Sequence, residues 1–357
     1  LDPDAVTRTL GVGERQQLEI LRLLSLGVKV LILDEPTSGI SADQREKLFA
    51  ALKRLASEGL IVLFVSHKLE EVEMLCDEVS ILRAGKLVGE RTLPCPNEEL
   101  VALMFDEPVL PYRPDSVASD SVVASLSGFV GHDGRTALAG VDLDIHAGEV
   151  IGLAGLEGSG QRAVLRALAG LVPAEDGSAS IDGTVVSSYE QSRSLGLHYL
   201  PAGRLEEGLV PGLTIAEHLE LALGSGSRLD ADEMEARALA AIEHYRIKGT
   251  PSSPVDGLSG GNQQRVLLAM MPAGLRVLGM EHPTRGLDIE SADFVWRALL
   301  ERRDDGTAIV FASADLDELL QYADRIAVMF EGRVIALRPA EELGGDELGY
   351  LIGGVRS

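Results

Sequence analysis

The sequence predicts an α/β fold in which one succession of strands and helices occurs twice along the chain. Two continuous apolar runs, at residues 28–33 and 60–65, have the length and composition of parallel strands buried on both faces. Helical spacing at 43–57 lies between them, as expected for a strand–helix–strand unit. The second half of the chain repeats these landmarks at a nearly constant distance, which indicates two related domains.

Composition narrows the class further. A length of 357 residues suits two domains of ordinary size, and 45% hydrophobic residues are enough for sizeable cores. The net charge of -24 predicts a solvated acidic surface and argues against a nucleic-acid partner, which needs basic patches. The spacing of Cys76 and Cys95 indicates neither a disulfide framework nor a metal site, so we expect the protein to lie in the reducing cytoplasm. No apolar run reaches about 18 residues, so no membrane span is predicted.

The first part of the chain, residues 1–105, reads as the C-terminal part of a domain. It opens with Leu1 in the middle of a pattern, and we therefore expect a fragment that lacks its natural N-terminus. Ligands bind at the carboxyl ends of strands in open α/β sheets, which draws attention to the polar residues after each strand. The expected elements, in order, are a helix at 18–24, a strand at 28–33, a helix at 43–57, a strand at 60–65, a helix at 70–75 and a hairpin at 79–88.

A proline-rich linker at 106–120 separates this part from a complete second domain at 121–357. Alternating segments at 122–129 and 138–145 predict antiparallel strands at its start. A strand, a glycine loop and an apolar helix follow at 149–162.

The repeat is carried by four ordered matches between the two parts. Their spacing is 248 residues at the first match and 247 afterwards, which is hard to obtain by chance. The matches are Leu10-Gly11-Val12-Gly13 with Leu258-Ser259-Gly260-Gly261, Asp34-Glu35-Pro36-Thr37 with Glu281-His282-Pro283-Thr284, Val65-Ser66-His67 with Ala312-Ser313-Ala314, and Asp77 and Gly85 with Asp324 and Gly332.

The glycine loop of the second domain has the layout of a P-loop. Gly155, Gly158 and Gly160 follow the pattern G-x-x-x-x-G-K-[ST], whose backbone N–H groups cradle nucleotide phosphates. Gln161 stands in the place of the lysine and Arg162 in the place of the Mg²⁺-binding hydroxyl. The loop predicts nucleotide binding through its backbone, and a tight strand–helix turn that binds nothing is the alternative.

Carboxylates and a histidine follow the two strands of the first part. This arrangement predicts a site that hydrolyses a nucleotide phosphate. In such a site we expect Asp34 to orient the Mg²⁺ shell, Glu35 to polarise the attacking water and His67 to contact the γ-phosphate. A structural role is the alternative for His67. The corresponding places in the second domain hold Glu281, His282 and Ala314. The second domain has therefore lost the catalytic carboxylate and the histidine together.

The stretch at 258–266 begins with a hydroxyl and two glycines and leads directly into an apolar helix. Glycine N–H groups approach a ligand closely, and a helix N-terminus suits phosphate. An ordinary helix cap is the alternative. The stretch resembles the signature LSGGQ of the ABC ATPases, and this resemblance implies nucleotide contacts for Ser259, Gly260, Gly261 and Gln263.

The resemblance covers the whole chain and narrows to the two-domain ATP-binding subunits of simple-sugar and nucleoside ABC importers. The stretches that carry it are Val12–Gln17, Gly155–Gly160, Pro201–Val210 and Asn262. It implies an α/β P-loop fold of the ABC ATPase type, with one partial and one complete, degenerate nucleotide-binding domain. Each ATP site of the family combines the P-loop of one domain with the signature of the other domain. We therefore expect one site with intact motifs and one site with degenerate motifs. Phe129 is a candidate for stacking on adenine, or else an ordinary core aromatic.

The family implies an ATPase, with ATP and Mg²⁺ as cofactors, that lies on the cytoplasmic face of the membrane. It acts on polytopic permease subunits fed by a periplasmic or lipoprotein substrate-binding protein. The first signature, Val12–Gln17, and the 201–210 stretch favour nucleosides over monosaccharides as the substrate. The 201–210 stretch departs from the usual sequence of the family at Ala202 and Gly203. The alternatives are a soluble twin-ABC protein on ribosomes and a regulatory protein that only binds nucleotide. We expect the chain alone not to hydrolyse ATP, because Glu35 and His67 have no P-loop in it.

Overall fold

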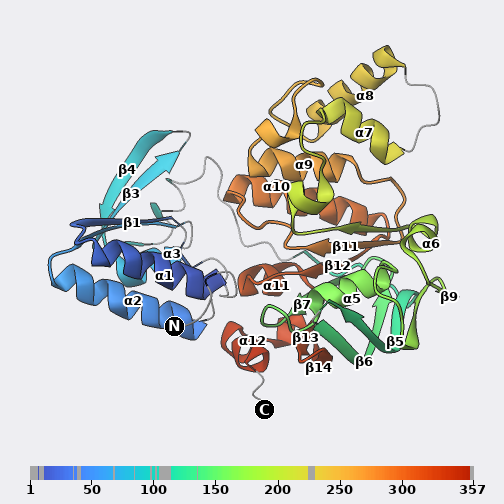
Figure 1. Ribbon diagram of the computed structural model, residues 1–357, viewed down its shortest axis with the longest axis horizontal. Coiled ribbons are helices and arrows are strands. Elements are labelled where there is room, and N and C mark those ends of the chain that lie inside the picture. The colour runs from blue at the N-terminus through green and yellow to red at the C-terminus, as the bar shows by residue number, and fades with distance from the viewer. Residues whose placement is uncertain are drawn as a thin grey trace. The chain divides into compact units, whose positions relative to one another are not determined.

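The computed structural model describes residues 7, 12–34, 36–37, 42–66, 69–83, 85–96, 99–100, 103, 114–134, 136–223 and 230–353. Contacts divide the chain into two compact units, Leu1–Tyr112 and Arg113–Ser357, which are described separately (Figure 1). Four residues of the predicted motifs, Leu10, Gly11, Glu35 and His67, lie outside the described residues.

The first unit is built on two parallel strands, with Asp34 paired in register with Val65 at their carboxyl ends. The predicted helix, strand and hairpin segments are all present, and the hairpin strands pair antiparallel. Its elements are α1 (Val12–Ser25), β1 (Val30–Asp34), α2 (Ala42–Ser57), β2 (Ile61–Val65), α3 (Leu69–Leu75), β3 (Glu78–Arg83) and β4 (Lys86–Thr92).

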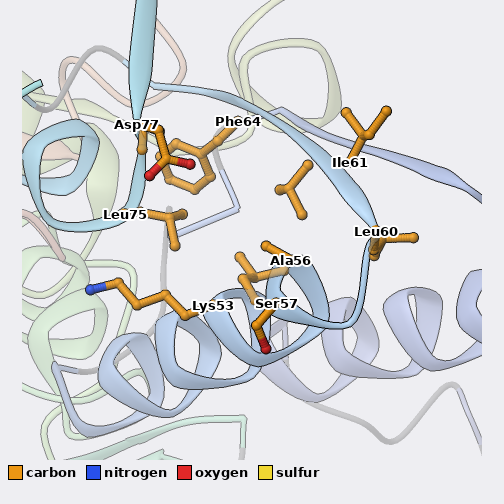
Figure 2. A pocket seen from close by; sticks show the side chains of 11 residues that line it. Lys53, Ala56, Ser57, Leu60, Ile61, Phe64, Leu75 and Asp77 are labelled. Atoms are coloured by element: carbon orange, nitrogen blue, oxygen red, sulfur yellow. The ribbon is translucent and has the colours of Figure 1, made fainter. Parts of the chain in front are cut away.

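The expectation that these two strands are buried on both faces is wrong for the described unit. Leu31 and Leu33 are buried, and they pack with side chains of α1 and α2. Ile32 and Ile61 on the other face are 64% and 60% exposed, because the described helices pack on one face only. A cavity of about 560 Å³ lies between α2 and β2 (Figure 2). It is lined by apolar side chains together with Lys53, Ser57, Cys76 and Asp77.

A six-stranded sheet forms the centre of the second unit. It has the order β10-β11-β12-β7-β13-β14, in which β14 alone is antiparallel to its neighbour. The central strands β7, β11 and β12 are buried along their whole length, as the apolar runs of such strands require. The strands are β7 (Val150–Ala154), β10 (Leu197–Leu200), β11 (Val277–Glu281), β12 (Ala308–Ala312), β13 (Arg325–Phe330) and β14 (Arg333–Pro339).

An antiparallel sheet of order β6-β5-β8-β9 confirms the strands predicted at the start of this unit. It packs with α5 against one face of the central sheet, and α9, α10 and α11 cover the other face (Figure 1). The strands are β5 (Val122–Asp133), β6 (Thr136–His146), β8 (Asp176–Ile181) and β9 (Thr184–Val185). The helices are α5 (Gln161–Leu168), α6 (Tyr189–Ser194), α7 (Ile215–Leu223), α8 (Ala231–His244), α9 (Gly260–Ala269), α10 (Ile289–Asp304), α11 (Leu316–Tyr322) and α12 (Gly345–Ile352), with short turns η2 (Arg204–Gly208), η3 (Val255–Gly257) and η4 (Ala340–Glu342).

The repeat predicted from sequence is present in the fold. The elements β1, α2, β2, α3, β3 and β4 each begin and end 247 residues before β11, α10, β12, α11, β13 and β14. Core contacts repeat as well: the Phe49 and Phe64 rings meet edge-on at 5.9 Å, and Trp296 and Phe311 do so at 4.9 Å. The described part of the first unit therefore repeats the fold of the corresponding part of the second unit. Residues that lie 247 positions apart can be compared directly.

Candidate functional site

The P-loop of the second unit runs from the end of β7 to the start of α5. Gly155, Gly158 and Gly160 have φ of +154°, +89° and +124°, a backbone region that side chains rarely adopt. A Cβ on Gly160 would also lie 2.9 Å from the Met329 side chain. No side chain caps the first turn of α5, so its N–H groups remain suited to phosphate oxygens.

Gln161, in the place of the lysine, folds back over its own loop. Its Nε2 donates a hydrogen bond to the carbonyl oxygen of Leu156 at 3.2 Å. The amide therefore supplies a neutral donor beside the loop, where the pattern calls for a positive charge.

Arg162, in the place of the hydroxyl, turns toward carboxylates. Its Nη2 lies 3.0 and 3.2 Å from the two carboxylate oxygens of Glu207, and its Nε lies 3.6 Å from Asp133. The same Nε lies 3.8 Å from Oε1 of Glu281. Burial alone would lower the pKa of Arg162, but the carboxylates of Glu281 and Glu207 raise it overall. Arg162 is therefore a permanent cation held among acids.

Glu281 ends β11 and is almost fully buried. The Tyr199 hydroxyl donates to its Oε1, and the backbone N–H of Ala202 donates to Oε2 at 3.4 Å. Burial and the hydrogen bond to Glu281 both raise the pKa of Tyr199, so the phenol keeps its proton and remains a donor. Both oxygens of this strand-end acid are thus engaged within the unit.

His282 occupies the sequence position that corresponds to Glu35, 247 residues earlier. It has φ of +46°, and its N–H donates to the carbonyl of Ala312 at 2.8 Å. Burial, with help from Arg285, lowers the pKa of His282 to about 4, so the ring is neutral at pH 7. A neutral imidazole held in this way has no carboxylate function, and Ala314 leaves no imidazole at the next strand end.

The signature opens α9 as predicted, with Ser259 at the N-cap and Gly260 and Gly261 in the first turn. The Ser259 hydroxyl accepts a hydrogen bond from the side chain of Asn262 at 2.8 Å and makes no cap bond. Gln263, for which the resemblance implies a nucleotide contact, bonds within its own unit in this structure. It is 8% exposed, and its amide donates to the carbonyls of Val255 and Leu258, bracing the turn before the helix.

Arg204, at the start of the segment after β10, was missed from sequence as a partner of the signature helix. Its Nε donates to Oε1 of Gln264 at 2.9 Å, and its Nη2 donates to the carbonyl of Arg285. A Cβ on Gly260 would lie 3.0 Å from its guanidinium. The segment 201–210 is therefore attached to the signature, which no local pattern indicates.

A second feature missed from sequence is a buried carboxylate behind the strand ends of each unit. Glu318 accepts hydrogen bonds from Thr284 Oγ1 at 2.5 Å, Ser313 Oγ at 2.5 Å and Trp296 Nε1 at 2.9 Å. In the first unit, Glu71 accepts from Thr37 and Ser66 at 2.7 and 3.3 Å. The same spacing of 247 residues relates Thr37, Ser66 and Glu71 to Thr284, Ser313 and Glu318, and it could have exposed the network.

Phe129 does not fit the predicted role of stacking on adenine. It is 1% exposed and lies in the core between the antiparallel sheet and α5. Its ring therefore has no free face for an adenine, and the core alternative holds. Asp34, by contrast, is exposed at the end of β1. Among the described residues, no group of three or more His, Cys, Asp or Glu side chains is placed to hold a metal ion.

Comparison with known proteins identifies the family. The profile of the ABC transporter family matches residues 138–275. Ribose import ATP-binding protein RbsA 1 of Rubrobacter xylanophilus is 36% identical over 96% of this chain and 70% of its own length. Nucleoside import ATP-binding protein NupA of Lactococcus lactis subsp. cremoris is 30% identical over 99% of this chain and 73% of its own. A solved ATP-binding subunit of an ABC transporter has a TM-score of 0.55 at 23% identity, covering 65% of this chain and 99% of that one, which supports the fold.

The chain therefore belongs to the ABC transporter family. It is an ATP-binding subunit homologous to ribose and nucleoside import ATP-binding proteins, and the predicted α/β P-loop fold of the ABC type is confirmed. None of the helices among the described residues combines the length and hydropathy needed to cross a bilayer.

Proposed function

We propose that this chain is the ATP-hydrolysing subunit that energises membrane import of a nucleoside or a simple sugar. The observation that carries the proposal is that the two related parts of the chain retain different motif residues of an ATP site. The first copy keeps Asp34, Glu35 and His67, and the second keeps Ser259 with its two glycines. The named import functions of the relatives support the same class, and they do not favour the alternatives of a ribosome-associated or purely regulatory twin-ABC protein.

In this proposal Glu35 polarises the attacking water, His67 contacts the γ-phosphate and Asp34 orients the Mg²⁺ shell. Ser259 and the N–H groups of Gly260 and Gly261 bind phosphate. The partners are polytopic permease subunits at the cytoplasmic face of the membrane, supplied by a substrate-binding protein, and no nucleic acid is involved. Nucleosides are favoured over monosaccharides by the sequence stretches that resemble that branch.

The second P-loop binds nucleotide weakly in this proposal. Its glycine backbone and the uncapped first turn of α5 are the groups available to the phosphates, because the lysine is absent. Saturable binding of a fluorescent ATP analogue in the millimolar range, abolished by Gly160→Val, is the expected result.

The deciding experiment measures ATPase activity and substrate uptake by the natural subunit reconstituted with its permease. Glu35→Gln should abolish both, since a positioned catalytic carboxylate is typically worth about 10²–10⁴ in rate. His282→Ala is the matched control, because its neutral ring stands at the corresponding strand end, and both activities should stay within a few-fold. Equal damage by the two variants would contradict the proposal, and parallel uptake assays with a nucleoside and a monosaccharide decide the substrate class.

A further inference from the structure

The two positions that hold the metal in P-loop enzymes face each other in the second unit. Such enzymes hold Mg²⁺ with the hydroxyl after the loop lysine and with an acid at the end of a neighbouring strand. Here those positions are Arg162 and Glu281, and their side chains form an ion pair with Nε 3.8 Å from Oε1. One metal ligand has thus been replaced by a cation that pairs with the other.

The residues present do not fit Mg²⁺. This ion requires oxygen ligands in near-octahedral geometry at about 2.0–2.1 Å, and it keeps several waters. The hydroxyl ligand is absent at position 162, and a guanidinium lies beside the remaining acid. Both oxygens of Glu281 already accept hydrogen bonds, from the Tyr199 hydroxyl and from the N–H of Ala202. A divalent cation would have to displace Arg162 and compete with these donors.

Arg162 is held in this place from several sides. Glu207 on η2 binds its Nη2 at 3.0 Å, and Asp133 at the end of β5 lies 3.6 Å from its Nε. Arg166, one turn further along α5, lies 3.2 Å from the same Asp133 carboxylate. Two guanidinium groups therefore balance most of the charge of three carboxylates, and the acids rather than a phosphate fix the position of Arg162.

We propose that the guanidinium of Arg162 is the resident cation of the second P-loop, and that this loop takes nucleotide without a divalent metal. The inference rests on the weak nucleotide binding proposed above for the same loop. It gives that site a distinct ligand, the metal-free nucleotide. It also separates the second P-loop from the first unit's proposed chemistry, in which Asp34 serves Mg²⁺.

The test is a titration of the chain with a fluorescent ATP analogue, once in EDTA and once with excess Mg²⁺. We expect dissociation constants in the two conditions to agree within about threefold. Arg162→Ser removes the cation and restores the hydroxyl, so its binding in EDTA should weaken about tenfold and Mg²⁺ should recover it. Arg297→Ser is the matched control, because it removes an exposed guanidinium on α10 that takes no part in the Arg162 cluster, and its response to Mg²⁺ should equal that of the parent.

Three results would overturn the inference. Binding by the parent chain that tightens about tenfold or more with Mg²⁺ overturns it and leaves the proposed weak binding intact. An Arg162→Ser variant that binds like the parent in both conditions also overturns it, because the cation would then contribute nothing. Absence of saturable binding in either condition removes the inference together with the proposed binding. Emission from Trp296, in the core of the same unit, confirms that each variant is folded.

Discussion

Replacing Thr284 by Val tests whether the buried carboxylate network supports the second unit. Valine keeps the shape of threonine but removes the hydroxyl that donates to Glu318 at 2.5 Å. A hydrogen bond to a charged group contributes about 1.5–3 kcal/mol. Burial raises the pKa of Glu318 while its hydrogen bonds oppose that rise, so we expect a loss near the middle of this range. For a unit of this size, a loss of about 2 kcal/mol corresponds to a fall in melting temperature of roughly 4–8 °C.

The assay is denaturant and thermal unfolding followed by tryptophan fluorescence. Trp296 is the single tryptophan of the chain, is 1% exposed, and donates to the same carboxylate at 2.9 Å, so its emission reports on this network. Thr284→Ser is the control, because it keeps the hydroxyl and loses one methyl group. We expect Thr284→Val to be clearly less stable than Thr284→Ser. If the two variants unfold together, the hydrogen bond contributes little and the reasoning fails.

Three further predictions concern other parts of the second unit. Ser259→Arg should abolish ATPase activity and uptake in the natural subunit with its permease, because the guanidinium fills the N-terminal turn of α9; retained turnover would refute the phosphate role of that turn. The pKa of His282 is lowered to about 4 in the folded state and is about 6.5 when unfolded, so stability should fall as pH drops through this interval. His282→Gln should flatten that fall, and an unchanged slope in unfolding curves would contradict it. Gly332→Ala should destabilise the unit by more than about 2 kcal/mol, because its Cβ would meet the Ala137 carbonyl oxygen at 1.8 Å; Gly306→Ala, with positive φ but open space, should cost less.

Sequence reasoning found the elements of this chain because their causes are local. An apolar run bounded by acids predicted β1, and the glycines that permit positive φ predicted the P-loop. The repeat added a long-range check, since the same succession of elements recurs 247 residues later. Among the described residues only one face of β1 and β2 is covered, because α1 and α2 pack on that face, and an apolar run does not specify which neighbours cover a strand.

The site was predicted less completely because its contacts join distant segments. Arg162 meets Asp133 from β5, Glu207 from η2 and Glu281 from β11, and nothing in the local sequence around Arg162 reveals these partners. Gln263 was assigned to the ligand by position in a motif, but the direction of its side chain is set by the carbonyls of the preceding turn. Motifs fix which backbone lies near a ligand, and rotamers decide which side chains reach it.

The buried network also indicates what the second unit retains. Thr284, Ser313 and Glu318 reproduce the arrangement of the first unit, although the sequence has His282 and Ala314 at the positions that correspond to Glu35 and His67. A network needed only for hydrolysis would have no reason to remain in a unit without a catalytic carboxylate. Two of its donors come from the segments that follow β11 and β12 and the third, Trp296, from α10, so it fixes these strand ends relative to α11 and α10. The second unit therefore keeps the framework around its strand ends, as the weak nucleotide binding proposed for it requires.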